Sequence, residues 1–570
     1  MVKPQITADL QEILKKLGLD GVEPSLAHPV QEAHGDYATN IAMVLWGKKK
    51  KAEWGSQGLK TPLDLASKIV ECYKSINPSY LGKVEVAPPG FINFWLAEDF
   101  LIGQLGQITK GKGKFGGIGR NRGTVMVEFA HPNTHKAFHL GHLRNIILGE
   151  SVCRLLKFSG TKVYRTNYQG DVGLHVAKCL WGFKNGQVKI EALDTLDKKI
   201  KALSDAYVLG HKGYSESPKS RGEIEELNQK LYRGEPEIGN LWSLTRGWSL
   251  EYFERIYQRV SVKFDRLYFE SEMAGPGKEL VLEYLEKGVF EKSEGAIIFP
   301  GKNYGLHNRV FLTGQDLPTY EAKDLALAQR EFSDFPVERI LHVVGSEQKG
   351  YFEVLFKALE MVLPETCGRE YHLIYGWVNL KTGKMSSREG EVVLGEWLLD
   401  EVKKKLKERY QMAEEVAEKV AVGAVKYSFL KVSLLQNIAF DIDESISLEG
   451  NSGPYLQYTY ARTQSVLEKA GSGEELTSDS LVLNPEEKAL LRTLYRFSEV
   501  VEEATGNYSP SLLCTYLFDL AQKFSLFYQN HQILKAKGSQ RALRLGLTQA
   551  VGQVVKNGLF LLGISAPRKM

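Results

Sequence analysis

A strand–helix–strand pattern across residues 124–169 constrains the fold of this chain more than any other feature. The apolar run TVMVEFA has the composition of a buried strand, HLGHLRNIILGESVCRLLKFSG has helical periodicity and ends on glycine, and TKVYRTNYQG follows as a second strand. Two strands joined by a helical crossover pair in parallel. The pattern resumes at RVFLT, RILHVVGS and YHLIYGWVNL, so we expect a multidomain α/β fold with a parallel, Rossmann-like sheet.

The chain is too long for one hydrophobic core. At roughly 100–200 residues per domain, its 570 residues predict three or four domains. We expect a small α+β N-terminal domain at 1–112, closed by the glycine-rich joint KGKGKFGGIGRNRG, and an all-α C-terminal bundle at 395–570. Between them, 113–394 would form the Rossmann-like domain, with a polar helical insertion at about 185–300 that lacks the apolar runs of buried parallel strands.

Composition excludes several classes of protein. No apolar stretch approaches the ~20 residues that span a bilayer, and the N-terminus lacks the apolar core of a signal peptide. The five cysteines are scattered and form no C-x-x-C pair, which argues against a disulfide framework and a cysteine-built zinc site. We therefore expect a soluble, cytoplasmic protein with no membrane partner. A net charge of +4 neither demands nor excludes a nucleic-acid partner.

The stretch HPNTHKAFHLGHLRN, residues 131–145, holds four of the twelve histidines. His139 and His142 flank Gly141 where the first strand passes into the helix. Because they are three residues apart, their side chains share one face of the helix. The N-terminus of a helix favours a phosphate. A zinc site would need further ligands, and neither H-E-x-x-H nor a nearby cysteine supplies them. We therefore expect no structural metal. The H-x-G-H pattern is short, and taken alone it could also occur by coincidence without a role.

A second basic motif, KTGKMSSREG at 381–390, follows the last predicted strand. It carries Lys381, Lys384 and Arg388 on a glycine- and serine-rich loop, which could close a cation over a leaving pyrophosphate. Taken alone, the stretch is equally typical of an exposed basic turn.

Together, HLGH and KMSSR resemble the two signature sequences of class I aminoacyl-tRNA synthetases. Within that class, VEFAHPNTHKAFHLGHLRN, NYQGDVGLH, GNSGPYLQYTYAR, HGDYATNIAM and APPGFINFWL are similar to arginyl-tRNA synthetases, in the family's order and across nearly the whole chain. Three features depart from the family: Tyr351 stands where many members have histidine, GDVGLH lacks a tryptophan, and the C-terminus is GISAPRKM.

The resemblance implies an arginine–tRNA ligase. L-Arginine would be activated by ATP to arginyl-adenylate and transferred to the 3′-terminal ribose of tRNA(Arg), with Mg²⁺ accompanying ATP and the enzyme acting as a monomer. It implies that charge on the phosphates is stabilised by His139, His142, Lys384 and Lys136. It further implies that ATP is contacted by Gly141, Met385, Ser386 and Ser387.

A site for arginine must hold a planar, permanently charged guanidinium, for which carboxylates are the expected partners. The resemblance implies that Glu128 and Asn133 contact the α-amino end of arginine, and that Tyr320, Asp324 and Gln348 shape the side-chain pocket. Asp324 is the expected guanidinium partner. Sequence alone leaves an ordinary surface charge equally open for Asp324, although its spacing from Tyr320 places both on one helical face.

The resemblance also implies RNA contacts in the N-terminal domain and in a C-terminal anticodon-binding domain. In the latter, Tyr455, Tyr458, Arg462 and Tyr528 could stack bases and neutralise phosphate. Aromatic residues at helical spacing are otherwise typical of a bundle core. Two rival functions remain: a nucleotidyltransferase without tRNA, disfavoured by the long helical C-terminal region, and a non-catalytic RNA-binding relative, disfavoured by the intact motif pair.

Overall fold

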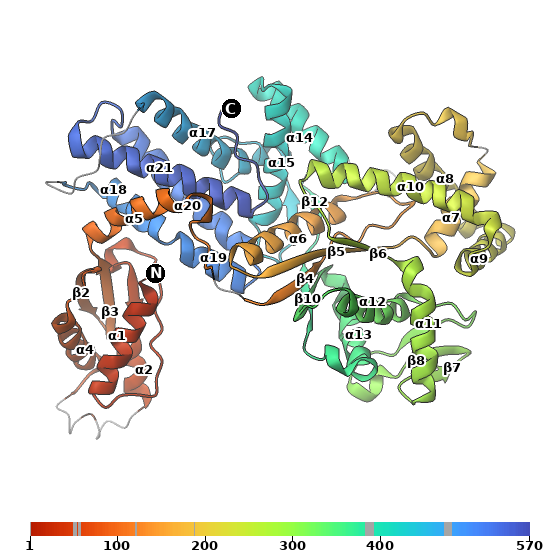
Figure 1. The fold of residues 1–570 in the computed structure, drawn as a ribbon, viewed down its shortest axis with the longest axis horizontal. Coiled ribbons are helices and arrows are strands. Elements are labelled where there is room, and N and C mark those ends of the chain that lie inside the picture. Colours follow the sequence, from red (N-terminus) through yellow and green to blue (C-terminus); the bar gives the residue numbers. More distant parts are fainter. Residues whose placement is uncertain are drawn as a thin grey trace.

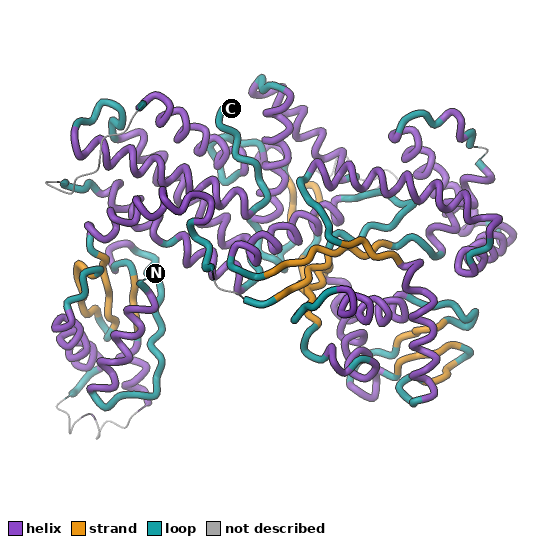
Figure 2. The backbone as a smooth tube through the Cα atoms, in the orientation of Figure 1, coloured by secondary structure: helices purple, strands orange, loops and turns teal. Residues whose placement is uncertain are grey.

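The computed structural model has a central parallel sheet, with helical layers above it and an N-terminal unit to one side (Figure 1). Strands gather in the middle of the molecule and in two small peripheral sheets, and helices form the remainder of the body (Figure 2). The structure describes residues 2–48, 54, 59–119, 122–186, 188–381, 393–471 and 481–570.

The N-terminal domain is a three-stranded antiparallel sheet of order β1-β3-β2, packed against helices. Its elements are α1 (Lys3–Lys16), β1 (Tyr37–Thr39), α2 (Ile41–Lys48), α4 (Pro62–Ile76), β2 (Leu81–Ala87), β3 (Phe91–Leu96) and α5 (Glu98–Gly111). Helix α4 begins with a capping box, in which the Thr61 side chain accepts from the Asp64 backbone and Asp64 accepts from the Thr61 backbone. The predicted α+β character of this domain is confirmed.

The central sheet has five parallel strands in the order β11-β10-β4-β5-β6. The strands and the first crossover helix are β4 (Thr124–Glu128), α6 (Leu140–Phe158), β5 (Lys162–Gln169), β6 (Arg266–Phe269), β10 (Arg339–Gly345) and β11 (Glu370–Tyr375). Glu128, the last residue of β4, lies in register with His342 on one side and Thr166 on the other. The predicted Rossmann-like sheet is confirmed, and its carboxyl edge is where ligands bind in such folds.

Two strand assignments differ from the expectation. The predicted insertion at about 185–300 follows α7 (Leu174–Asn185) and is helical through α8 (Leu196–Glu216), α9 (Pro218–Arg233) and α10 (Pro236–Arg259). Strand β6, within that range, belongs to the parallel sheet. Strand β6 is a four-residue edge strand, too short to give an apolar run. RVFLT forms β9 (Arg309–Leu312), which pairs antiparallel in a small outer sheet with β8 (Ala296–Phe299).

That outer sheet is completed by β7 (Glu291–Ser293), and its β7–β8 hairpin turns at Glu294 and Gly295, both with positive φ. A local hairpin therefore uses apolar residues that were expected to join the central sheet. Three helices accompany this part of the chain, namely α11 (Glu270–Glu286), α12 (Tyr320–Asp334) and α13 (Lys349–Val362).

The C-terminal region is helical, apart from one short strand. Its elements are α14 (Gly395–Tyr410), α15 (Glu414–Leu430), β13 (Ile438–Phe440), α16 (Ile442–Ser445), α17 (Gly453–Ala470), α18 (Pro485–Tyr495), α19 (Phe497–Gly506), α20 (Pro510–Asn530) and α21 (Gly538–Leu561). The expectation of an all-α region from 395 onward was wrong at β13, which pairs with β12 (Val378–Leu380). Strand β13 has only three residues, which are too few to show the alternating pattern that predicts a strand.

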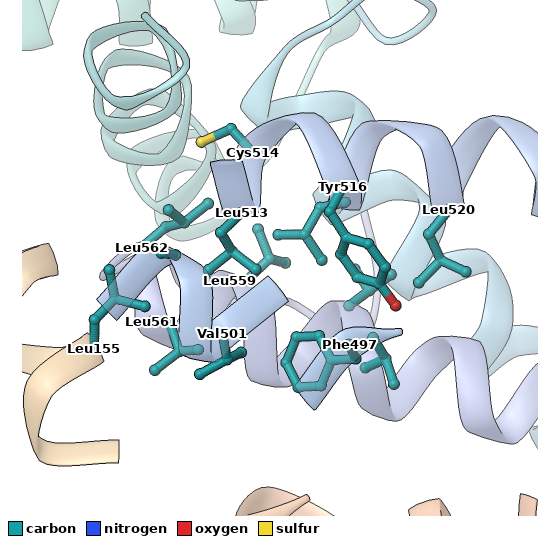
Figure 3. Close-up of a cluster of buried hydrophobic side chains, with 14 of the residues drawn as sticks. Leu155, Phe497, Val501, Leu513, Cys514, Tyr516, Leu520, Leu559, Leu561 and Leu562 are labelled. Atoms are coloured by element: carbon teal, nitrogen blue, oxygen red, sulfur yellow. The ribbon is translucent and has the colours of Figure 1, made fainter. Parts of the chain in front are cut away.

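The helical bundle shares its core with the crossover helix of the sheet domain. Figure 3 shows Leu155 of α6 in one apolar cluster with side chains of α19, α20 and the C-terminal end of α21, including Val501, Leu513 and Leu561. Ser151 of α6 also donates to the Leu561 carbonyl (3.0 Å). The two domains are therefore packed as continuous structure around α6. Within the described residues, no helix is both long and apolar enough to span a bilayer.

Candidate active site

The connection from β4 to α6 is strained and held by side chains. Ala130, His131 and His135 all have positive φ, at 84°, 45° and 61°. Such backbone costs roughly 1–2 kcal/mol per non-glycine residue and persists only where the surroundings hold it. Here Asn145 accepts from the Ala130 N–H (2.6 Å) and Asn167 accepts from the His131 N–H (3.1 Å). The connection is therefore fixed over the carboxyl edge of the sheet.

The two motif histidines lie together at the N-terminus of α6. Their rings stack with centroids 3.8 Å apart and planes 20° apart. His139 Nδ1 accepts from the Gly141 N–H (3.1 Å), and His142 Nδ1 accepts from the His139 N–H (3.3 Å). A ring nitrogen that accepts carries no proton, so in the neutral imidazole Nε2 bears the hydrogen and donates.

Both rings are kept neutral. Burial, and then the nearby Lys136 charge, lowers the pKa of His139; burial and then His139 lower that of His142 well below its usual value. A Cβ on Gly141 would lie 2.9 Å from the His139 ring, so glycine leaves room for that ring to fold back onto the helix. The site thus offers neutral Nε2–H donors at the positive end of a helix, which suits an anion.

The second motif lies largely outside the described residues: Lys384, Met385, Ser386, Ser387 and Arg388 belong to the segment that the structure does not describe. The flanking residues on both sides are placed. Leu140 N donates to the Val393 carbonyl (3.1 Å) and Gly395 N to that of Phe138 (2.8 Å), so the chain after the motif pairs with HLGH. On the other side, Lys381 lies 3.3 Å from Asp441.

Lys136 stands on the approach to α6, where it faces the helical insertion. Its ammonium lies 5.8 Å from the centre of the Tyr207 ring in α8, and it is half-buried. Burial, and then the charge of Lys178, lowers the pKa of Lys136. Lys136 therefore places a positive charge near HLGH, and the charge of Lys178 lies close to it.

The residues expected to read arginine gather around α12. Asp324 and Glu128 line one enclosed cavity of about 20 Å³ between the sheet, α12 and α13. Tyr351 on α13 donates its hydroxyl to the Asp324 carboxyl (2.5 Å). Burial raises the pKa of Asp324 to about 8, although this hydrogen bond opposes the rise. The family departure at Tyr351 thus has a structural role, since it supports the carboxyl group expected to bind the guanidinium.

The remaining pocket residues lie near the same edge of the sheet. Tyr320 begins α12, one turn before Asp324, and is 53% exposed. Asn133 forms an isolated parallel bridge with Gly170, just beyond β5. Gln348 lies exposed in the 3₁₀ turn that follows β10. All three therefore lie around the carboxyl edge, where a ligand would bridge them.

Sequence reasoning missed the buried residues beneath Glu128. His342 Nδ1 lies 3.3 Å from Glu128 Oε2, and His342 Nε2 donates to Glu370 Oε2 (2.5 Å). His131 Nδ1 lies 3.3 Å from Glu128 Oε1, and Glu331 of α12 packs on the same carboxylate. The available signal was a polar residue inside an apolar strand, such as the histidine of RILHVVGS.

The candidate RNA contacts separate into two groups. The Arg462 guanidinium lies 4.7 Å from the centre of the Tyr458 ring and 5.0 Å from that of Tyr528, at an open cavity of about 960 Å³. Tyr455, by contrast, is 8% exposed and packs edge-on against Phe518 at 5.8 Å. The expectation that Tyr455 presents its ring to a base was therefore wrong, because its side of α17 faces the bundle core.

Among the described residues, no group of three or more histidine, cysteine, aspartate or glutamate side chains is arranged to hold a metal ion. The cysteines at positions 72, 153, 179, 367 and 514 are all free.

Comparison with known proteins covers the chain from end to end. Residues 104–442 match the family "tRNA synthetases class I (R), catalytic domain", residues 456–570 the "DALR anticodon binding domain" and residues 4–96 the "Arginyl tRNA synthetase N terminal domain". The catalytic match thus continues through α14 and α15, beyond the boundary expected at 394.

Curated relatives agree with these matches. An arginine–tRNA ligase of Treponema denticola is 37% identical over 83% of this chain and 84% of its own length. One of Bacteroides thetaiotaomicron is 33% identical over 90% and 91%. The solved Thermus thermophilus arginyl-tRNA synthetase has the same fold, with a TM-score of 0.81 at 24% identity and full coverage of both chains. The chain therefore belongs to the arginyl-tRNA synthetase family of class I aminoacyl-tRNA synthetases.

Proposed function

We propose that this chain is an ATP-dependent arginine–tRNA ligase. In the first step, the arginine carboxylate attacks the α-phosphorus of ATP, forming arginyl-adenylate and releasing pyrophosphate. In the second, the 2′-hydroxyl of the terminal tRNA ribose attacks the activated carbonyl and AMP leaves. No protein nucleophile is needed, so the side chains act by binding, orienting and stabilising charge.

The observation that carries this proposal is the pair of neutral imidazole donors at the N-terminus of α6, on the same sheet edge as Glu128 and Asp324. Donors aimed at developing negative charge lower the barrier of phosphoryl and nucleotidyl transfer. A cationic amino acid needs the opposite, namely carboxyl groups that can accept from its ammonium and guanidinium. One edge of the sheet offers both environments.

In the proposed complex, His139 and His142 donate to the ATP phosphates, and the backbone at Gly141 leaves space for the nucleotide. Lys384, with Met385, Ser386 and Ser387, would close over the phosphates, and Lys136 would add positive charge. What supports the placing of the second motif is that residues 393–395 pair with residues 138–140. Mg²⁺ would accompany ATP on the pyrophosphate oxygens.

On the amino-acid side, Asp324 would accept from the arginine guanidinium and Tyr320 and Gln348 would flank it. Glu128 and Asn133 would hold the α-ammonium. The proton that burial keeps on Asp324 would leave when the guanidinium enters, because a permanent cation favours the carboxylate.

For tRNA, we infer contacts in the N-terminal domain and at the surface formed by Tyr458, Arg462 and Tyr528. Rings for stacking next to a cation for phosphate are the usual composition of a single-strand site.

We also propose that the domains divide near residues 112 and 394. We further propose that the enzyme acts in the cytoplasm as a monomer. Free cysteines support a reducing compartment, and light scattering would measure the molar mass in solution and so test the monomeric state.

One pair of assays tests the function. A tRNA(Arg) transcript is incubated with ATP and each amino acid in turn, and only arginine should be attached. ATP–pyrophosphate exchange with arginine is then measured with and without tRNA; the family resemblance predicts exchange that depends on tRNA. Attachment of a different amino acid, or a failure to attach any, would overturn the proposal.

A further inference from the structure

Three neighbouring strands place ionisable side chains on one face of the sheet beneath the amino-acid pocket. Glu128 of β4 is in register with His342 of β10, and His342 is in register with His372 of β11. Glu370 lies two residues before His372, so it shares that face. Helices α12 and α13 cover the face, and the rings of Phe352 and Phe356 lie 5.3 and 6.0 Å from that of His342.

His342 is held between two carboxylates with both ring nitrogens engaged. Its Nδ1 lies 3.3 Å from Glu128 and its Nε2 2.5 Å from Glu370. Although burial alone would lower the pKa of His342, the charges of Glu128 and then Glu370 raise it well above its usual value. The ring forms a hydrogen bond with Glu370 through Nε2, and its Nδ1 faces the second carboxylate at ion-pair distance. A protonated ring, which carries a hydrogen on both nitrogens, suits this position between two carboxylates.

Burial, and then the Glu128 charge, raises the pKa of Glu331 well above the ordinary value, so Glu331 stays protonated. Burial alone would also raise the pKa of Glu128, but His342 and then His131 lower it. His342 thus faces two carboxyl groups, so Glu128 can still accept from an incoming ammonium while it lies beside the ring.

We propose that His342, itself held by Glu370, is a positioning residue for Glu128: it keeps that carboxylate ionised and fixed at the end of β4, ready for the α-ammonium of arginine. This inference rests on the proposed role of Glu128 in arginine binding. In this proposal His342 does not contact the substrate itself. It acts through Glu128, which has a buried Oε2 with no hydrogen-bond partner among the described residues and so depends on the facing charge.

The alternative is a purely structural ion pair, whose loss would lower stability without changing substrate selectivity. Two variants separate these roles. His342→Gln removes the charge, and Glu370→Gln keeps volume while removing the partner that holds the ring. The matched control is His372→Gln, which changes a histidine on the same face, beside Phe356 at 5.5 Å. Nδ1 of His372 has no hydrogen-bond partner among the described residues.

The experiment uses the full chain with tRNA and follows KM for arginine, KM for ATP and kcat. It adds inhibition by argininic acid, which carries a hydroxyl in place of the α-ammonium. We expect His342→Gln to raise the arginine KM on the order of 10-fold or more, as for loss of a charged contact, and Glu370→Gln to raise it less. In both variants, the ATP KM and the inhibition constant of argininic acid should stay within about twofold of wild type. All kinetic constants of the His372→Gln enzyme should stay within the same range.

The outcomes are distinguishable. If wild type does not charge arginine, the proposed function fails. If wild type charges arginine but both variants keep its arginine KM, or weaken arginine and argininic acid equally, the positioning role is overturned and the cluster is structural. Thermal melting reports folding, and if His342→Gln does not fold, Glu370→Gln decides by the same criteria.

Discussion

The two halves of the candidate site solve opposite electrostatic problems on one sheet edge. The nucleotide half presents neutral imidazoles at the N-terminus of α6, and burial keeps their rings uncharged. The amino-acid half buries carboxyl groups, one of them beside an imidazolium. The difference shows that neutral dipoles can be fixed in a binding site at a small cost in free energy. A buried charge costs much more, so it needs charged or hydrogen-bonding partners before any substrate binds.

The largest effect on arginine binding should come from Asp324→Asn, which keeps the shape of the side chain and removes the carboxyl group. We expect the arginine KM to rise by about 100-fold or more, because a buried carboxylate–guanidinium pair is lost, while the ATP KM stays near wild type. Steady-state aminoacylation measures both. An unchanged arginine KM would remove Asp324 from the pocket.

The same variant should be more stable than wild type. Burial raises the pKa of Asp324 from 3.8 to about 8, so between these values the folded chain holds a proton that the unfolded chain loses. The free energy of unfolding therefore falls as pH rises across that window, and the penalty is fully present above it. Asparagine removes this penalty, so the Tm at pH 8 should exceed that of wild type. Equal Tm values at pH 8 would show that the carboxyl is not destabilised by burial.

On the nucleotide half, His139→Asn should lower kcat by about 10²- to 10³-fold with little change in the arginine KM. Asparagine can still accept from the Gly141 N–H as an N-cap, but it lacks the Nε2–H donor. Single-turnover adenylate formation checks this separation. A rise in the arginine KM with normal kcat would mean that the two halves are not distinct.

The pH dependence should also separate the halves. The arginine KM should fall as pH rises towards about 8, because binding of the guanidinium requires an ionised Asp324. The ATP KM should not follow this profile, since burial already keeps His139 and His142 neutral at pH 7. Initial rates between pH 6 and pH 9 test both statements, and parallel profiles for the two substrates would contradict them.

A smaller effect is expected at the RNA surface. Arg462→Ala should raise the tRNA KM by about 10-fold and leave the arginine and ATP KM values unchanged, because it removes a cation between two rings that line an open cavity. Tyr455→Phe is the control, since that ring is buried against Phe518. Equal effects of the two changes would show that Arg462 acts only through folding of the bundle.

Contiguous features were predictable from the sequence. The β4–α6–β5 unit and the HLGH motif each lie in one stretch, so periodicity and spacing reveal them. Tyr320 and Asp324 share α12 as their spacing indicated.

Features assembled from distant segments were not predictable. His342, Glu331 and Glu370 meet only because β10, β11 and α12 pack together, and each is a single polar residue within its own element. Strand β6 is too short to give a recognisable pattern in the sequence. The segment RVFLT pairs with a neighbouring strand in a local antiparallel sheet and does not join the central sheet. Tyr455 was misjudged because helical spacing does not tell which face meets the core.

The central claim is that a buried carboxyl selects the arginine charge. The most direct test compares arginine with citrulline, its uncharged isostere, in aminoacylation by wild type and Asp324→Asn. Wild type should favour arginine by about 10⁴-fold in kcat/KM, as expected for a site whose polar group would otherwise be left unpaired, and the variant should lose most of that preference. A variant that still prefers arginine as strongly as wild type would contradict the account.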